Sequence, residues 1–373
     1  MICSIEISLL IILLLYVSSL SSVIVGWIQI KKKPLISEVT HQNISIVIAV
    51  RNEGDRIKAC LTSVINQNYD KSNFELILID DHSTDGTIQI AEKAIENTSL
   101  NFTIVKLKDK YSKKEALKKG VKYAQHPIIA LTDGDCILPP NWLSIISNHL
   151  KNEVSMLLGP VIFSDGQGFL GTFQFLDMCA VQGVTFGLAY YHQPVLNNGA
   201  NLAYLKETYH QVNGYDNYNT PSGDDIFLLE KFKSHRKKVV GIMDEQFIVK
   251  TYSERSWSSF INQRLRWASK TGYYKDVFLI FVSSIIFIQN LIVFFIYLGM
   301  LFVEEIRFIG IILIISKWLI DFILLFLLSS YFKQRDRLLY FIPVQLVYPI
   351  YIVTVAVASK FYKFKWKDRI FNE

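Results

Sequence analysis

The sequence predicts an α/β domain, with a mostly parallel sheet flanked by helices, between an N-terminal and a C-terminal group of transmembrane helices. The two ends of the chain are long apolar runs, while the middle has the composition of a globular domain; hydrophobic residues make up 51% of all 373. In the middle, β-branched runs alternate with helical patterns. Such alternation is typical of βα units, which build parallel sheets.

The strands and helices of this middle part are read from their hydrophobic periodicity. The expected strands are residues 43–50, 74–81, 102–107 and 127–135. The expected helices between them are residues 56–69, 83–97 and 113–124. In the first, Ile57, Leu61, Val64 and Ile65 are spaced three and four positions apart, which is one face of an α-helix, and the second opens with residues typical of a helix cap.

The apolar runs are long enough to cross a bilayer, which takes about 20 residues as a helix. Ile7–Ile30 is followed directly by three lysines at 31–33, so we expect a retained anchor with the next domain in the cytoplasm. Val277–Val303, Ile306–Phe332 and Leu338–Ser359 are three further candidates. Two topologies stay open for the last one: a simple crossing, or a re-entrant hairpin broken at Pro343 and Pro349 that would keep the basic tail inside.

These segments predict a multi-pass protein of the plasma (inner) membrane with four regions. They are an anchor and its basic flank (1–33), a cytoplasmic catalytic domain (34–254), an amphipathic interfacial helix (255–275) and a C-terminal membrane region (276–373). The net charge of +6 comes largely from clusters that border the apolar spans, so membrane lipids are the expected partner of these charges and nucleic acid is not. The four cysteines show no metal-ligand spacing.

Polar and acidic residues follow three of the expected strands. They are Arg51 and Glu53, then Asp80 and Asp81, then Asp133 and Asp135. Since ligands of parallel sheets bind at the carboxyl ends of the strands, these groups predict a site at one edge. Two carboxylates two positions apart repel each other unless a cation lies between them, and Mg²⁺ or Mn²⁺ would also bridge phosphate oxygens.

The residues after the sheet predict a helix with two different faces. Between 255 and 273, Trp257, Ile261, Leu265 and Ala268 share one face, and Gln263, Arg266, Trp267 and Lys270 share another. The first face would lie on apolar surface and the second would face the edge of the sheet. An interfacial helix that carries Trp and Arg as membrane anchors is the alternative, and both readings are compatible.

Five motifs in this order resemble the family 2 glycosyltransferases: IAVRNE (48–53), IDDHSTDGT (79–87), TDGDC (132–136), GDDIFLL (223–229) and QRLRW (263–267). The resemblance covers residues 44–267, and the flanking membrane helices resemble the branch with polysaccharide synthases and ceramide glucosyltransferases. It implies a GT-A fold that binds a nucleotide sugar, and inverting transfer of the sugar from a nucleotide diphosphate sugar, with a UDP-sugar as the expected donor, to a lipid or a growing glycan.

The resemblance also implies roles for individual residues. Arg51, Glu53, Asp80, Asp81, Lys113 and Asp133 would bind the nucleotide sugar, and Asp133 and Asp135 would hold the metal. Asp225 would be the general base, with Asp224 in place of the usual Glu. Gln263, Arg264, Arg266, Trp267, Asn198 and Gly199 would contact the acceptor or the diphosphate. Lys113 lies in a motif that departs from the family pattern, because Ser112 replaces a Gly and Lys118 an Asn.

Two other classes of protein share part of this pattern. A phosphohydrolase of the haloacid dehalogenase type has a D-x-D and an acidic pair, but it requires Thr or Val where Ile137 stands and leaves two βα units without a role. A non-catalytic membrane scaffold that keeps a nucleotide-binding fold is the third reading. Within the membrane region, Lys317 and Asp321 lie one helical turn apart; they are expected to neutralise each other, with a functional pair as the alternative.

Overall fold

The computed structural model describes residues 2–31, 41–108, 112–216, 223–304, 306–361, 365–366 and 369–370. Its centre is a seven-stranded sheet of order β3-β2-β1-β4-β7-β5-β8. The strands are β1 (Ile44–Val50), β2 (Phe74–Asp80), β3 (Asn101–Lys106), β4 (Ile128–Asp133), β5 (Val154–Leu158), β7 (Leu202–Leu205) and β8 (Lys238–Gly241). All neighbours pair in parallel except β7, which is antiparallel to both β4 and β5. The expected mostly parallel sheet is therefore confirmed.

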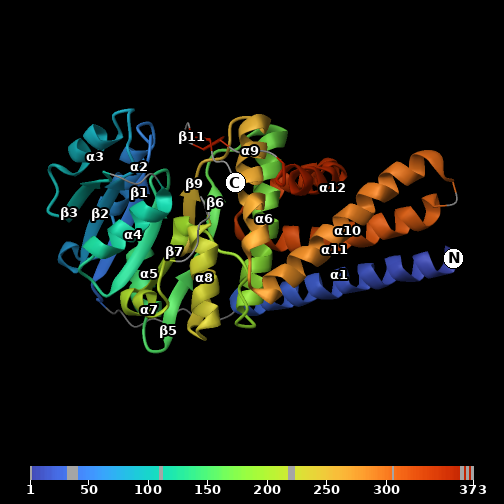
Figure 1. The fold of residues 1–373 in the computed structure, drawn as a ribbon, viewed down its shortest axis with the longest axis horizontal. Coiled ribbons are helices and arrows are strands. Elements are labelled where there is room, and N and C mark those ends of the chain that lie inside the picture. Colours follow the sequence, from blue (N-terminus) through green and yellow to red (C-terminus); the bar gives the residue numbers. More distant parts are fainter. Residues whose placement is uncertain are drawn as a thin grey trace.

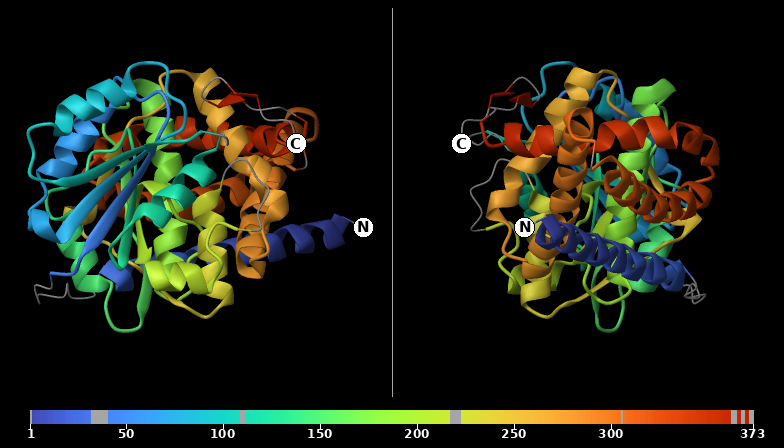
Figure 2. Two further views of the ribbon diagram at one scale, coloured as in Figure 1. Left: turned by 60° about the vertical axis from the view of Figure 1, so that its left-hand side comes forward. Right: turned by 90° about the vertical axis from the view of Figure 1, so that its right-hand side faces the viewer.

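Helices cover both faces of this sheet, as Figure 2 (left) shows. One face packs on α2 (Ile57–Ile65), α3 (Thr87–Ile95) and α5 (Trp142–His149). The other packs on α4 (Lys113–Tyr123), α6 (Gly168–Ala189) and α8 (Asp224–Ser234). Ile46 and Ile48 face the first layer and Val47 the second, because successive strand residues point to opposite faces. A short α7 (Lys206–Gln211) follows β7, and β6 (Val161–Phe163) pairs with β9 (Val249–Thr251).

Four helices are long and apolar enough to cross a membrane, within the part of the chain that the structure describes. They are α1 (Ile2–Lys31), α10 (Val277–Phe302), α11 (Arg307–Tyr331) and α12 (Phe341–Ala358), the last preceded by a 3₁₀ turn, η5 (Arg335–Tyr340). Figure 1 shows α1, α10 and α11 projecting together away from the sheet, with α6 between the sheet and these helices. A short pair of strands, β10 (Lys365–Trp366) and β11 (Arg369–Ile370), follows α12.

The membrane helices are packed directly onto the α/β domain. The core on the α6 side of the sheet continues without a break into side chains of α1, α10, α11 and α12. Where α1 crosses α6, a side chain at Gly26 would lie 2.0 Å from the carbonyl oxygen of Gly187, and one at Gly187 would lie 2.3 Å from that of Val23. Glycines at this crossing let the two backbones touch, as small residues do between membrane helices.

The sequence left the topology of the last apolar segment open, and the structure has a continuous helix there in place of a hairpin. Residues Phe341–Ala358 are one helix, and Pro349 lies inside it. A proline in a membrane helix removes one backbone hydrogen bond, and neighbouring helices compensate for this loss. The helix lies beside α9 (Trp257–Ala268), where the rings of Tyr351 and Phe260 stack with centroids 5.6 Å apart.

Lys317 and Asp321 form the expected ion pair, with Nζ and Oδ2 2.6 Å apart. The pair also joins three helices. The Tyr16 hydroxyl of α1 donates to Asp321 Oδ1 at 2.6 Å, and Lys317 donates to the side-chain oxygen of Gln345 in α12 at 3.2 Å. This network satisfies the buried charges of α11, which accounts for the pair without a catalytic role.

Candidate active site

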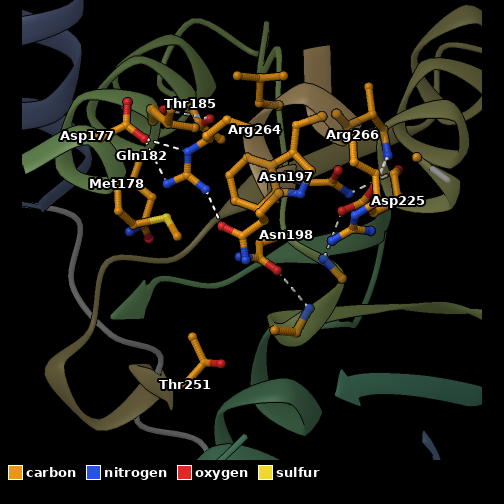
Figure 3. A pocket seen from close by; sticks show the side chains of 18 of the residues that line it. Asp177, Met178, Gln182, Thr185, Asn197, Asn198, Asp225, Thr251, Arg264 and Arg266 are labelled. Atoms are coloured by element: carbon orange, nitrogen blue, oxygen red, sulfur yellow. Dashed lines mark hydrogen bonds and ion pairs between the residues drawn. The ribbon is translucent and has the colours of Figure 1, made fainter. Parts of the chain in front are cut away.

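One cavity of about 800 Å³ extends from the carboxyl edge of the sheet to the membrane helices. At the end beside the sheet, it is lined by residues that follow β1, β2 and β4, by the start of α8 and by the inner face of α9. At the end beside the membrane helices, it is lined by residues of α1, α6, α10, α11 and α12. The three strand ends that the sequence predicted to meet at one edge therefore do contribute to a single cavity. Figure 3 shows part of this lining.

The loops after β1 and β2 are tied together at the end of the cavity beside the sheet. The Arg51 guanidinium donates to the backbone oxygen of Asp81 at 2.7 Å, and the backbone amide of Glu53 donates to the hydroxyl of Thr87 at 2.8 Å. Asn52 and His82 have φ of 49° and 61°, a strained conformation that often occurs at functional sites. Arg51, Glu53 and Asp81 all line the cavity.

Asp80 has a different position from the one expected. It is buried, it does not contribute to the lining of the cavity, and its Oδ1 accepts the backbone amide of Ser83 at 2.9 Å. The carboxylate therefore holds the turn after β2, an arrangement common for Asp at turns. Of the two neighbouring aspartates, only Asp81 lines the cavity.

Asp133 and Asp135 stand side by side where β4 ends. Lys113 at the start of α4 pairs with Asp133, and Arg56 at the start of α2 lies 3.5 Å from Asp135. A side chain at Gly134 would lie 2.7 Å from Val50 Cγ1, so only glycine allows this close approach of the loop to β1. Burial raises the pKa of Asp135, and the neighbouring Asp133 carboxylate raises it further.

A divalent cation fits this pair of carboxylates. Hard oxygen ligands suit Mg²⁺ and Mn²⁺, and a cation would relieve the repulsion that disfavours the charged form of Asp135. Among the described residues no third His, Cys, Asp or Glu joins the two aspartates. The remaining ligands would therefore be water and substrate oxygens, as is usual for Mg²⁺ at phosphate sites.

Asp225 lies at the start of α8 and is held in place by the loop at residues 197–199. Its Oδ2 accepts the backbone amide of Gly199 at 3.1 Å, and its backbone oxygen accepts from the Asn197 side chain at 3.1 Å. Asn198 caps the short turn Gly199–Asn201 by accepting from the amide of Ala200. This loop was expected to contact the acceptor. In the structure it positions the carboxylate of Asp225.

Asp224 is the buried partner of Asp225. Burial raises the pKa of Asp224 to about 6, the nearby Lys113 ammonium opposes this rise, and Asp225 adds to it. Two adjacent carboxyl groups with different surroundings can divide proton transfer and charge stabilisation between them. Both carboxyl groups line the cavity, and Asp224 is the more deeply buried of the two.

The inner face of α9 presents the predicted residues to the cavity. Gln263, Arg266, Trp267 and Lys270 all line it, although the α-helix ends at Ala268 and Lys270 lies in a 3₁₀ turn, η4 (Ser269–Tyr273). Arg266 lies beside Asp225 (Figure 3). The Gln263 side chain donates to the Glu254 carboxylate at 3.0 Å. Trp257, on the opposite face, contacts Phe173 of α6, so that face lies on apolar side chains as expected.

Arg264 is buried and paired inside the protein. Its Nε donates to Asp177 Oδ2 of α6 at 2.8 Å, and Tyr348 of α12 donates to the other oxygen of Asp177 at 3.2 Å. The guanidinium also lies 4.1 Å from the ring centroid of Trp267. Figure 3 shows this pair beside the cavity. Arg264 therefore links α9 to α6 and α12 and supports Trp267. Its partner Asp177 had no motif by which the sequence would have revealed it.

Family models match most of this architecture. Residues 45–186 match the model of glycosyl transferase family 2, and residues 128–355 match that of glycosyl transferase family group 2. The second match covers more than half of the chain. The protein belongs to glycosyl transferase family group 2.

Two curated relatives and one solved structure show how far the similarity extends. The glycosyltransferase AglE of Haloferax volcanii is 33% identical over 126 residues, which cover 34% of this chain and 41% of that protein. A poly-beta-1,6-N-acetyl-D-glucosamine synthase of Staphylococcus aureus is 27% identical over 156 residues, 41% of this chain and 37% of that protein. The matched part of the chain thus spans about two fifths of either relative.

The solved structure is a mannosyltransferase, PcManGT from Pyrobaculum calidifontis, in complex with GDP-Man and Mn²⁺. It superimposes with a TM-score of 0.63 at 15% identity, covering 95% of this chain and 99% of that one. Similarity at this level of identity concerns the fold. The expected GT-A fold of the central domain is therefore confirmed, and the structural similarity extends over nearly the whole chain.

Proposed function

We propose that this protein is an inverting, metal-dependent glycosyltransferase. It transfers a hexosyl group from a nucleoside diphosphate sugar, either a UDP-sugar or a GDP-sugar, to a lipid or a growing glycan at the cytoplasmic face of the membrane. The observation that carries the proposal is the single cavity lined by Asp81, the Asp133–Asp135 pair, Asp225 and the inner face of α9. Its continuation between the membrane helices supports an acceptor that approaches from the bilayer.

The chemistry follows from the placement of the carboxylates. Asp225 takes the proton of the acceptor hydroxyl as that oxygen forms a bond to the anomeric carbon. The bond from that carbon to the diphosphate breaks on the opposite side, and the nucleoside diphosphate leaves. A Mg²⁺ or Mn²⁺ ion held by Asp133 and Asp135 would supply charge neutralisation on the diphosphate. Arg266, beside Asp225 and lining the same cavity, stabilises the same negative charge.

Activity assays separate this function from its rivals. Membranes that contain the protein are incubated with a panel of UDP- and GDP-sugars, with and without Mn²⁺, and the released nucleotide and the lipid or glycan products are measured by mass spectrometry. A transferase gives a glycosylated product and a nucleoside diphosphate from one donor, and needs the metal. A phosphohydrolase would instead cleave the diphosphate into a nucleoside monophosphate and a sugar 1-phosphate and form no glycosylated product, and a non-catalytic scaffold would leave every donor intact.

Replacing Asp135 by Ala is expected to weaken Mn²⁺-dependent binding of UDP or GDP about tenfold or more, because the variant removes half of the carboxylate pair. Calorimetry of the purified protein, with Mn²⁺ and then with a chelator, measures the effect. Binding without metal is the internal control and should be unaffected. Equal affinities of variant and wild type in the presence of Mn²⁺ would remove the metal role of this pair.

A further inference from the structure

Lys270 is a buried cation whose place in the site the fold does not explain. Its side chain is 6% exposed and lines the cavity. Three other cations of this lining each pair with a carboxylate: Lys113 with Asp133, Arg56 with Asp135 and Arg264 with Asp177. Among the described residues, no hydrogen bond or ion pair to the Lys270 ammonium is found. An ammonium without a partner is unfavourable in a largely buried cavity, so this positive charge lacks its counterpart.

The backbone fixes this lysine next to the general base. Gly223, the residue before α8, has φ of +99°, and a side chain there would lie 2.7 Å from Lys270 Cδ. The stem of Lys270 therefore fills the space that glycine leaves at the start of α8. Burial lowers the pKa of Lys270 to about 8, and the Asp225 carboxylate, the largest of the charges that oppose this effect, raises it. Lys270 thus acts electrostatically on the end of the cavity where Asp225 lies.

The chemistry of the cavity identifies the missing counterpart. A lysine ammonium is a compact charge that binds phosphate oxygens well. Asp224 and Asp225 already supply the nearby carboxylates, and Asp225 must remain free to accept a proton. An anion brought in by a substrate pairs with Lys270 without using either carboxylate. The substrates of a glycosyltransferase of this kind carry phosphate on the donor, and a lipid acceptor can carry one as well.

We propose that Lys270 binds a phosphate oxygen of a bound substrate. The proposal rests on the proposed function, because it assigns to the same cavity a phosphate group from one of two sources: the diphosphate of the nucleotide sugar or a phosphate on the acceptor. This role differs from metal binding, which is assigned to Asp133 and Asp135, and from proton abstraction, which is assigned to Asp225. It is a substrate-binding residue in the turn that follows the QRLRW motif.

The test compares three variants of the full-length protein in detergent. Lys270→Met removes the charge and keeps the length of the side chain, and Lys270→Arg keeps the charge. Lys238→Met is the matched control, since Lys238 at the start of β8 is exposed, pairs with Glu153 and does not line the cavity. Calorimetry measures binding of UDP and GDP with Mn²⁺ in one arm. The second arm measures binding of phosphatidic acid in mixed micelles. Phosphatidylcholine, which is zwitterionic and has no net charge, is the reference lipid.

Lys270→Met is expected to lower the affinity for the nucleotide or for the phosphatidic acid about tenfold to a hundredfold, as loss of a charged hydrogen bond does. The arm that responds identifies the source of the phosphate. Lys270→Arg should recover most of the affinity, and Lys238→Met should change neither. The melting temperature of ligand-free Lys270→Met should equal or exceed that of the wild type, because the variant removes an unpaired buried charge.

Two results would overturn this assignment. One is unchanged affinity of Lys270→Met in both arms. The other is a fall in its melting temperature with an equal loss of binding in Lys270→Arg, which would make the lysine a structural residue. A wild-type protein that binds neither UDP nor GDP would instead contradict the proposed function itself, so the two failures are distinguishable.

Discussion

Asp225→Asn is expected to lower the rate of sugar transfer by about 10²–10⁴-fold, the usual contribution of a general base. Asparagine keeps the shape of the side chain, and its oxygen can still accept the Gly199 amide that now binds Asp225 Oδ2. The loop at residues 197–199 and the start of α8 should therefore stay in place. What the variant loses is a group that can accept a proton. Nucleotide binding, which depends on residues at the other strand ends, should change little.

The effect of Asp225→Asn is compared with that of a control aspartate variant, and both the transfer rate and the nucleotide affinity are measured. Asp216→Asn is the control, because Asp216 is exposed and pairs with Lys118 at the surface. The rate constant comes from mass spectrometry of the product, and the nucleotide affinity comes from calorimetry on the same preparations. Normal turnover of Asp225→Asn would show that another residue accepts the proton. A parallel loss of affinity would show that Asp225 holds the substrate.

Arg264→Met is expected to be the most destabilising of the proposed variants, by about 3–5 kcal/mol, the range found when one partner of a buried ion pair is removed. Both Arg264 and Asp177 are nearly inaccessible, so the remaining carboxylate would have neither its cation nor water. The Trp267 ring would also lose the guanidinium that lies 4.1 Å from its centroid. Transfer should therefore fall even in the fraction of protein that stays folded.

The double variant Arg264→Met/Asp177→Leu distinguishes the two effects. Replacing both partners by apolar groups should recover most of the stability, because no unpaired charge remains. Transfer should stay low, because Trp267 is still unsupported. Arg307→Met is the control, since Arg307 forms an exposed pair with Glu304 and such pairs contribute little. Thermal unfolding measures the first effect and product formation the second. Recovery of both would limit Arg264 to a structural role.

The sequence predicted those parts of the site that depend on local pattern. β-branched runs that end in charged residues marked the carboxyl edges of β1, β2 and β4, and parallel pairing necessarily brings those edges together. The helical spacing of Gln263, Arg266 and Trp267 likewise predicted the face that lines the cavity. In each case the periodicity of a single element was enough to predict which of its residues line the cavity.

The remaining features depend on partners that are distant in the sequence. Asp177 binds Arg264 across 87 positions, and no pattern within α6 separates it from an ordinary polar residue. Whether Asp80 or Asp81 faces the cavity depends on the turn after β2, where Asp80 accepts the Ser83 amide. The antiparallel β7 is only four residues long, too short for its alternation to be distinguished from a loop. Whether Pro349 interrupts the last apolar segment could not be decided from its sequence, and in the structure this proline lies inside one continuous helix.

The central claim is that a nucleoside diphosphate and a divalent cation bind at the carboxyl edge of the sheet, in the cavity that Asp225 also lines. The most direct measurement is a structure of the protein with nucleotide and Mn²⁺, in which the anomalous scattering of manganese locates the ion. We expect the manganese peak between the Asp133 and Asp135 carboxylates and the diphosphate oxygens, with the nucleoside beside Asp81. A nucleotide bound elsewhere, with no manganese at these two aspartates, would contradict the account.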